Sequence, residues 1–149
     1  MNKLLLSLLL VFLTQVVFSQ SFKNTFYLDG SNNVEPAGIA VDSNDDIYSL
    51  VKFSGELFLN SETVTSSGNA DILLLKTSSN GEIIWYDHII GKASDEPTDI
   101  IVTSSDEIYV LGAFQDSLFF LNRDTLISTG GFDVFLAKFW WRKNSKKIK

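Results

Sequence analysis

The sequence predicts an all-β fold made of two tandem copies of one unit, and three observations carry that prediction. Residues 35–59 and 96–120 are identical at 12 of 25 positions when they are aligned at a fixed offset of 61. Short apolar runs alternate with polar turn residues through both segments, as they do in antiparallel strands. After the first 20 residues no stretch keeps a 3.6-residue apolar period, so we expect almost no helix.

The repeat extends through turns as well as core positions. Identical pairs at the offset of 61 include Glu35/Glu96, Pro36/Pro97, Ile39/Ile100, Val41/Val102, Ile47/Ile108, Tyr48/Tyr109 and Phe53/Phe114. One inserted residue raises the offset to 62, after which Asp71 aligns with Asp133 and Lys76 with Lys138. Chance likeness between two β-rich stretches is the alternative, and the shared turn residues argue against it.

Each unit is expected to contain four antiparallel strands. In the first unit the predicted strands are Gly38 to Val41, Ile47 to Phe53 with a short extension at Glu56 to Leu59, Ile72 to Thr77, and Glu82 to Ile90. The polar stretch Ser61 to Gly68 is expected to be irregular. Ser79-Asn80-Gly81 predicts a hairpin, because Asn-Gly accepts the positive φ angles of a type I′ turn.

Four antiparallel strands in each repeated unit are typical of propeller blades. The segments GIAVDSNDDIYSLVKFSG, GNADILLLKTSSNGEIIW, EIYVLGAF and GGFDVFLAKF resemble the SBBP-type β-propeller repeat of bacterial secreted proteins. The resemblance covers about residues 24–139 and implies tandem four-stranded β-propeller blades in an incomplete propeller. It places the strand at Ile39 to Val41 nearest the propeller axis and the strand of Trp85 outermost.

This interpretation divides the chain into five parts. Residues 1–19 are a signal peptide, 20–35 the outer strand of a preceding incomplete blade, 36–95 the first blade, 96–139 an incomplete second blade, and 140–149 a basic tail. A polar turn and a fourth strand are expected after Phe139, where the sequence instead reads WWRKNSKKIK. The tail has two interpretations, a frameshifted or truncated reading frame and a genuine basic extension.

The N-terminus predicts export from a bacterial cell. Lys3 precedes the apolar run Leu4 to Leu13, and Val17 and Ser19 stand at the −3 and −1 positions of a cleavage site. A single-pass anchor is the alternative, but the apolar run is short for a membrane span of about 20 residues. We therefore expect cleavage after Ser19 and a secreted or cell-surface protein. The chain contains no cysteine, which excludes lipoprotein anchoring and disulfides.

The charge of the mature body excludes polyanionic partners. Residues 20–139 contain six basic and eighteen acidic residues, a net charge of −12. Nucleic acid and anionic lipid surfaces repel such a body, because both carry dense negative charge. No nucleic-acid partner is expected, and no membrane association after signal cleavage.

Acidic residues at odd spacing suggest a calcium loop in the first unit. Asp42, Asn44 and Asp46 have that spacing, but no Gly follows Asp46 and no Glu completes the ligand set. The second unit has Thr103 and Ser105 at the first two positions. A solvated turn between strands is therefore the favoured interpretation.

Two aspartates and the single histidine are the other titratable candidates. Asp71 and Asp133 recur in a G-x-x-D context, which favours a side chain that accepts backbone N–H bonds before a strand, over a ligand role. His88, beside Asp87, is interpreted as a surface histidine of the outer strand, since one His without Cys makes no typical zinc site. Composition allows a Ser-His-Asp arrangement, but no G-x-S-x-G elbow is present.

Two adjacent aromatic residues, Trp85 and Tyr86, are expected to pack one blade against its neighbour, with a carbohydrate platform as the alternative. No residue is predicted to be catalytic, to bind a cofactor or to ligate a metal. The expected function is a non-enzymatic exported repeat module that acts as a scaffold or binds an unidentified protein or glycan. Self-association through exposed blade faces is expected. The alternative is a fragment of a larger propeller enzyme or substrate-binding protein, with its active residues in further blades.

Overall fold

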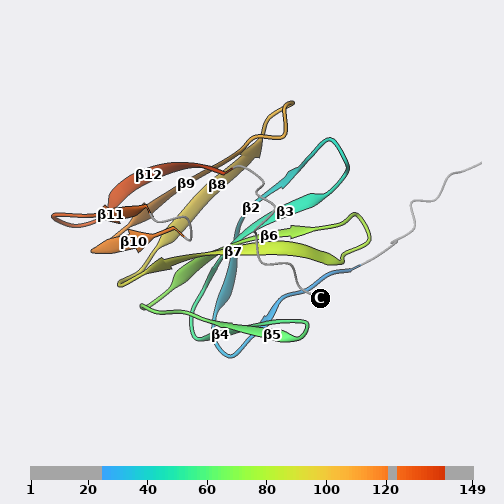
Figure 1. Ribbon diagram of the computed structural model, residues 1–149. Coiled ribbons are helices and arrows are strands. Elements are labelled where there is room, and N and C mark those ends of the chain that lie inside the picture. Colours follow the sequence, from blue (N-terminus) through green and yellow to red (C-terminus); the bar gives the residue numbers. More distant parts are fainter. Residues whose placement is uncertain (1–24, 121–123, 140–149) are drawn as a thin grey trace, which may run out of the picture.

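The protein is all-β. The computed structural model describes residues 25–120 and 124–139, and all the regular structure of these residues is strand (Figure 1). The predicted signal peptide (1–19) and basic tail (140–149) lie outside the described residues. In the described ranges no helix is long and apolar enough to span a membrane. The all-β prediction is therefore confirmed.

Twelve strands form three antiparallel sheets in the described residues. They are β1 (Asp29–Gly30), β2 (Val34–Val41), β3 (Ile47–Phe53), β4 (Glu56–Leu59), β5 (Glu62–Thr65), β6 (Asp71–Thr77), β7 (Ile83–Gly91), β8 (Glu96–Val102), β9 (Ile108–Phe114), β10 (Ser117–Phe119), β11 (Thr125–Ile127) and β12 (Asp133–Phe139). We call β2 to β7 repeat 1 and β8 to β12 repeat 2.

Both repeats have the same strand order. Strands β2-β3-β6-β7 are successive neighbours in a six-stranded sheet, and β8-β9-β12 form a separate sheet in the equivalent order. A hairpin leaves each sheet at the equivalent point, β4-β5 after β3 and β10-β11 after β9. Figure 1 shows the sheet of repeat 2 lying over one face of the sheet of repeat 1, with β4-β5 on the opposite face. The chain therefore stacks its two repeats face to face.

The strand registers of the two repeats agree residue by residue. Tyr48 pairs with Ala40 and Lys76, and Tyr109 pairs with the equivalent Ile101 and Lys138. Further equivalent pairs are Phe53 with Asp71 and Phe114 with Asp133, and Leu57 with Val64 and Leu118 with Leu126. The prediction that the aligned positions are structural equivalents is confirmed.

Backbone irregularities repeat as well. The register of β2 on β3 shifts between Pro36 and Gly38, and that of β8 on β9 shifts between Pro97 and Asp99. In the turns that follow β2 and β8, one aspartate has a positive φ, 63° at Asp45 and 58° at Asp106. Such strained positions are rare for residues other than glycine, so their recurrence supports one shared unit.

The turn at Ser79-Asn80-Gly81 differs from the prediction. Gly81 has a φ of 84°, whereas Asn80 is not among the residues with positive φ, so the turn is not type I′. The Gly81 N–H donates to the Ser78 carbonyl at 2.8 Å, and the Ser78 N–H donates to the Glu82 carbonyl. This is a three-residue hairpin in which a type I turn is followed by one left-handed residue. The turn ending at Asp45 has the same bonds.

The expectation that Ser61 to Gly68 is irregular is wrong, because β5 lies within it. Glu62–Thr65 pairs with β4 through a two-residue turn, in which Asn60 has a φ of 50°. Only one side chain of β5, Val64, is buried, which explains why the sequence pattern gave no strand signal. Strand β2 also begins four residues earlier than predicted.

Two apolar clusters lie on opposite faces of the repeat 1 sheet. The inter-repeat core joins Tyr48, Leu50, Leu74 and Trp85 of repeat 1 with Ile100, Val110, Phe114 and Phe135 of repeat 2, among others. The second cluster lies beneath the β4-β5 hairpin and contains Phe53, Leu57, Leu73 and Tyr86, among others. Adjacent residues of β7 point to opposite faces of a strand, so Trp85 enters the first cluster and Tyr86 the second.

Candidate functional site

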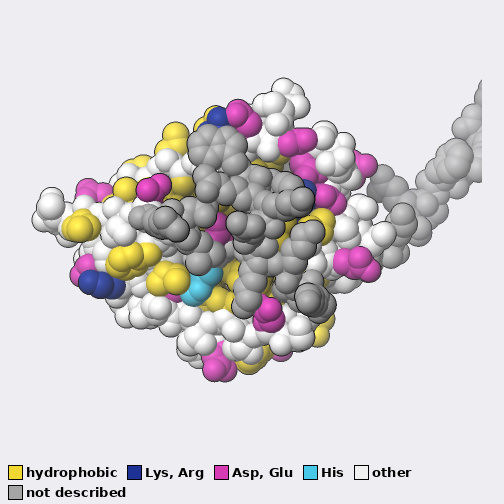
Figure 2. Space-filling view, viewed as in Figure 1, with side chains coloured by type: hydrophobic (Ala, Val, Ile, Leu, Met, Phe, Trp, Pro, Cys, Tyr) yellow, Lys and Arg dark blue, Asp and Glu magenta, His cyan; other side chains and the backbone are white. Residues whose placement is uncertain are grey.

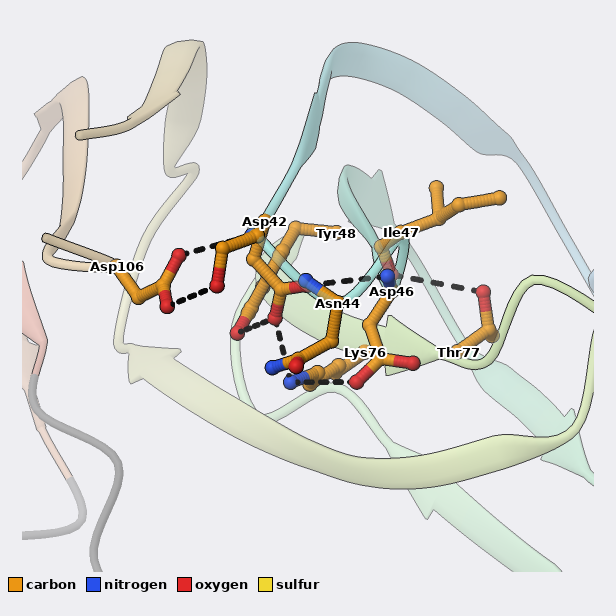
Figure 3. Close-up of polar contacts among 9 residues, drawn as sticks. Asp42, Asn44, Asp46, Ile47, Tyr48, Lys76, Thr77 and Asp106 are labelled. Atoms are coloured by element: carbon orange, nitrogen blue, oxygen red, sulfur yellow. Dashed lines mark hydrogen bonds and ion pairs between the residues drawn. The ribbon is translucent and has the colours of Figure 1, made fainter. Parts of the chain in front are cut away.

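The turn between β2 and β3 holds a buried ionic network, which we call the Asp42 network (Figure 3). The Asp42 Oδ1 atom accepts the backbone N–H groups of Asn44 (2.9 Å) and Asp46 (3.0 Å). These bonds close the turn locally, in the way an aspartate commonly stabilises a turn. Asp42 itself is buried, whereas Ser43, Asn44 and Asp45 are exposed, so the turn is solvated as expected except at its first residue.

Lys76 supplies the positive charge of this network from β6. Its Nζ atom lies 2.7 Å from Asp42 Oδ2 and 2.9 Å from Asp46 Oδ2, and 5.0 Å from the centre of the Tyr48 ring. Burial would raise the pKa of the Asp42 carboxyl, but Lys76 and the two backbone N–H donors outweigh it and lower that pKa. The same bonds outweigh desolvation at Lys76 and raise its pKa, so the ammonium stays charged.

The odd-spaced acidic side chains therefore bind an internal ammonium group. Among the described residues no group of three or more His, Cys, Asp or Glu side chains could hold a metal ion. Calcium would have to displace Lys76 from both Asp42 and Asp46, which leaves that ammonium buried without a partner.

We predict that isothermal titration of the mature chain with CaCl₂ shows no binding tighter than about 1 mM, the range of weak extracellular modules. The matched control is Asp46→Ala, which should give the same titration as the wild type. A stoichiometric micromolar signal that disappears in Asp46→Ala would contradict this account.

Repeat 2 contains a counterpart of the Asp42 network with different chemistry. Thr103 replaces Asp42, and its hydroxyl accepts the backbone N–H groups of Ser105 (3.3 Å) and Glu107 (3.1 Å). Lys138, equivalent to Lys76, lies 2.5 Å from Glu107 Oε1 and 5.3 Å from the centre of the Tyr109 ring. The recurrence shows that this cation joins the strands of each repeat.

A second polar group, which we call the Asp71 cluster, lies at the opposite end of β6. The fully buried Asp71 accepts the backbone N–H of Ser67 (2.9 Å) through Oδ2 and that of Gly91 (3.3 Å) through Oδ1. Its Oδ2 atom also lies 2.7 Å from His88 Nε2. The predicted structural role of Asp71 is confirmed. Asp133 is exposed and has no such bond among the described residues, so the two aspartates do not share this role.

His88 is not a surface histidine, and that expectation is wrong. Its side chain is mostly buried, and its ring centre lies 5.4 Å from that of Phe53. His88 is on the same face of β7 as Tyr86, where the β4-β5 hairpin covers the sheet. Strand β7 is therefore covered on this face, and the histidine pairs with the buried Asp71.

Asp95, between β7 and β8, is a buried acid that the sequence did not single out. It is fully buried, and neither carboxylate oxygen has a hydrogen-bond partner among the described residues. Burial, followed by the nearby charges of Asp71 and Glu96, raises the pKa of Asp95 to about 7. Repeat 1 has Val34 at the equivalent position. An aspartate at a position that is apolar in the other repeat is the sequence signal that could have identified Asp95.

Asp87 of β7 is a half-buried acid whose Oδ1 atom has no hydrogen-bond partner among the described residues. Burial raises its pKa to about 6, against the opposing effect of His88. Asp87 lies on the other face of β7 from His88 and lines a hollow beside β12, so it is separate from the Asp71 cluster. Ser117 Oγ is buried without a hydrogen-bond partner, and no serine hydroxyl bonds to His88 in the described part of the chain.

The buried state of Trp85 and Tyr86 contradicts the carbohydrate-platform alternative. Trp85 stacks edge-on against Tyr48 at 5.9 Å in the inter-repeat core. The Tyr86 hydroxyl donates to Glu62 Oε2 at 2.8 Å beneath the β4-β5 hairpin. Trp85 therefore contributes to packing between the repeats, as the sequence predicted, and Tyr86 packs inside repeat 1.

Two of the hollows on the surface of the described residues lie against β12 and against β2. The larger, which we call the β12 groove, has a volume of about 800 Å³ and is lined mainly by Phe120, Asp124, Leu126, Asp87 and strand β12. The other, about 550 Å³, lies against β2 and is lined by Phe26, Leu28, Pro36, Ile39 and neighbouring residues. Figure 2 shows acidic side chains scattered over the visible face with few basic ones between them.

The chain matches no protein-family model, and no curated protein shows significant sequence similarity to it. The class that the structure defines is an all-β protein of two register-equivalent repeats. The two polar groups described above lie inside these repeats.

Proposed function

We propose that the chain is an exported, non-enzymatic repeat module that serves as a scaffold at the bacterial cell surface or outside the cell. The proposal rests on one observation: two repeats with the same strand register pack against each other through a shared apolar core. In repeat arrays each unit contacts mainly its neighbours, and the stack of units presents an extended surface on which partners bind. A protein or a glycan is the proposed class of partner.

The polar residues that sequence reasoning singled out support this proposal. Asp42 and Lys76 close a turn and join strands, and Asp71 and His88 join β6 to β7. These contacts stabilise the repeats themselves. The uneven charge of the mature body supports a partner other than nucleic acid or anionic lipid.

We further propose that the two repeats are tandem propeller blades, the second of them incomplete. The order β2-β3-β6-β7 supports this proposal, because a propeller blade is a four-stranded antiparallel meander and blades of a propeller stack face to face. The open faces at both ends of the stack also favour a second candidate, part of a larger propeller enzyme or substrate-binding protein.

Export is tested by expressing the full chain with a C-terminal epitope tag in a Gram-negative host. We predict cleavage after Ser19, so that the tagged protein outside the cytoplasm begins at Gln20. Subcellular fractionation and N-terminal sequencing provide the measurement, and a Ser19→Phe variant, which enlarges the −1 side chain, is the matched control. A tagged chain that keeps Met1 and stays in the cytoplasm would refute the proposed location.

A further inference from the structure

Repeat 2 exposes the face that repeat 1 buries. Ile72 and Leu74 of β6 are 0 % exposed in the inter-repeat core, whereas their equivalents in β12, Val134 and Leu136, are 75 % and 69 % exposed. Leu50 and Leu111 show the same contrast. Such a contiguous apolar face is unusual on an isolated soluble domain and indicates an interaction surface.

Repeat 1 exposes the complementary face at the other end. Ile100 of β8 is 3 % exposed because it packs against Gly38 of repeat 1, where a Cβ would lie 2.9 Å from Ile100 Cγ2. Its equivalent in β2, Ile39, is 70 % exposed. The exposed surface of β2, which we call the open face of repeat 1, is thus equivalent to the part of β8 that packs on repeat 1. Phe53 and Leu73, the equivalents of Phe114 and Phe135, are buried beneath the β4-β5 hairpin.

The residues before repeat 1 occupy the position of an outer strand. Gly30 pairs with Leu57 of β4, and Gly91, at the end of β7, pairs with the equivalent Leu118 of β10. Leu28 packs against the cluster beneath β4-β5, as its equivalent Ile89 packs in the inter-repeat core. The segment that ends at Gly30 therefore corresponds to β7. No strand of the described residues pairs with this segment in the way that β6 pairs with β7.

The β12 groove is the place that β7 occupies in repeat 1. β12 pairs with β9 on one side and with no other strand of the described residues. Phe120, Leu126 and Asp124 line the groove, and they are equivalent to Leu59, Val64 and Glu62, residues of the hairpin that covers Tyr86 of β7. An outer strand laid along β12 would fill this groove.

One polar contact between the repeats has its equivalent donor in repeat 2 and its equivalent acceptor in repeat 1. Ser43 of repeat 1 donates to Asp106 of repeat 2 through its backbone N–H (2.9 Å) and its hydroxyl (2.6 Å). The equivalent donor in repeat 2 is Ser104, and the equivalent acceptor in repeat 1 is Asp45, which has the same left-handed backbone as Asp106. Ser104 and Asp45 lie on the two open ends.

We infer that the chain binds a second copy of itself head to tail, through the open face of repeat 2 on one copy and that of repeat 1 on the next. The segment Thr25–Gly30 of the second copy pairs with β12 in the register of β7 on β6, so that Leu28 faces Val134 and Phe26 faces Leu136. This inference deepens the proposed scaffold function by naming its partner. The interface is heterologous, so it builds rings or filaments.

Two positions make the contact between copies weaker than the contact between repeats. Lys52 and Glu96, 2.5 Å apart, link the repeats, but the equivalent of Lys52 in repeat 2 is Ala113. Gly38, which admits Ile100, is replaced by Asp99. Asp99→Gly is therefore expected to tighten self-association by about tenfold, the effect of about 1.4 kcal/mol.

Sedimentation velocity of the mature chain Gln20–Lys149 tests the inference. The weight-average mass is expected to rise beyond two copies between about 1 µM and about 500 µM, and Leu136→Lys should weaken association at least ~100-fold by burying an unpaired charge. The matched control is Ile127→Lys, which alters a side chain 73 % exposed on β11, outside both end faces. Association in that control should equal the wild type.

Mixing two blocked variants decides the head-to-tail geometry. Ile39→Lys and Leu136→Lys each keep one intact end, so each alone should be monomeric, and a 1:1 mixture should form a dimer and nothing larger. The double variant Asp45→Ala/Ser104→Ala, which leaves the internal Ser43–Asp106 contact intact, should weaken association about tenfold.

Three outcomes would overturn the inference: a wild type that stays monomeric throughout, equal effects of Leu136→Lys and Ile127→Lys, or no dimer in the mixture. A monomeric wild type would be the result if residues 140–149 of the same chain fill the β12 groove. Because this assay reads mass and the export assay reads location, failure of the inference leaves the proposed function testable on its own.

Discussion

Replacing Asp95 by valine is expected to stabilise the protein at pH 8 by about 2 to 4 kcal/mol. Asp95 is buried without a partner, and its pKa of about 7 in the folded state lies well above the ordinary value of 3.8. The full difference between those pKa values is worth about 4 kcal/mol. Valine is the residue that repeat 1 has at the equivalent position, Val34, where it packs against Gly30 as Asp95 packs against Gly91.

The pH dependence of this effect has a definite sign. Below about pH 4 the Asp95 carboxyl is protonated in both the folded and the unfolded chain, so its ionisation costs nothing. Between about pH 4 and pH 7 the unfolded chain releases the proton while the folded chain keeps it, so the free energy of unfolding falls as the pH rises. Asp87, with its pKa raised to about 6, acts in the same direction in both proteins.

Urea denaturation of the wild type and Asp95→Val at pH 4, 6 and 8 measures this prediction. The stability difference should increase from pH 4 to pH 8 and then level off. Asp133→Asn, at an exposed aspartate, is the control and should change stability by less than about 0.5 kcal/mol at each pH. A difference that does not vary with pH, or an Asp95→Val protein less stable than the wild type at pH 8, would show that Asp95 is not a buried, uncompensated acid.

The second large effect is expected from Leu74→Ala, compared with Leu136→Ala at the equivalent position. Leu74 is fully buried in the inter-repeat core, so its truncation should cost about 2 to 5 kcal/mol in lost burial and cavity formation. Leu136 lies on the open face of repeat 2, so its truncation should cost less than about 0.5 kcal/mol in the monomer. The two substitutions remove the same atoms from equivalent strands.

Urea denaturation at about 1 µM protein, low enough to limit self-association, provides this comparison. Equal losses for the two variants would mean that the faces are equally covered, and the stacking direction described above would be wrong. A larger loss for Leu136→Ala would place the shared core on the other face of the sheets.

Most strands could be predicted from the sequence, because the two repeats could be compared position by position. The bounds of β3 and β4 agree with the predicted ranges, and the shared positions Tyr48 and Tyr109 identify the register of the repeat from the sequence alone. The strand β5 was missed because three of its four side chains are polar and only the fourth, Val64, is buried.

The polar sites were less predictable, since their partners come from strands distant in the sequence. Lys76 lies 34 residues from Asp42, and no local sequence pattern indicates that its ammonium group contacts both Asp42 and Asp46. His88 lies 17 residues from Asp71, and its burial depends on a hairpin that packs over the face of β7. Asp95 illustrates the same limit, because its burial follows from packing of the segment between β7 and β8.

The central claim, that repeat 2 stacks on repeat 1 in the described register, is tested most directly by zero-length cross-linking with a carbodiimide. This reagent joins an amine to a carboxylate only where the two are in contact. Lys52 and Glu96, 2.5 Å apart on different repeats, should yield a cross-linked peptide pair in the monomer fraction. Lys138 and Glu107, also 2.5 Å apart within repeat 2, are the internal control. Recovery of both links is the predicted result, and recovery of Lys138–Glu107 without Lys52–Glu96 would contradict the stacking of the two repeats.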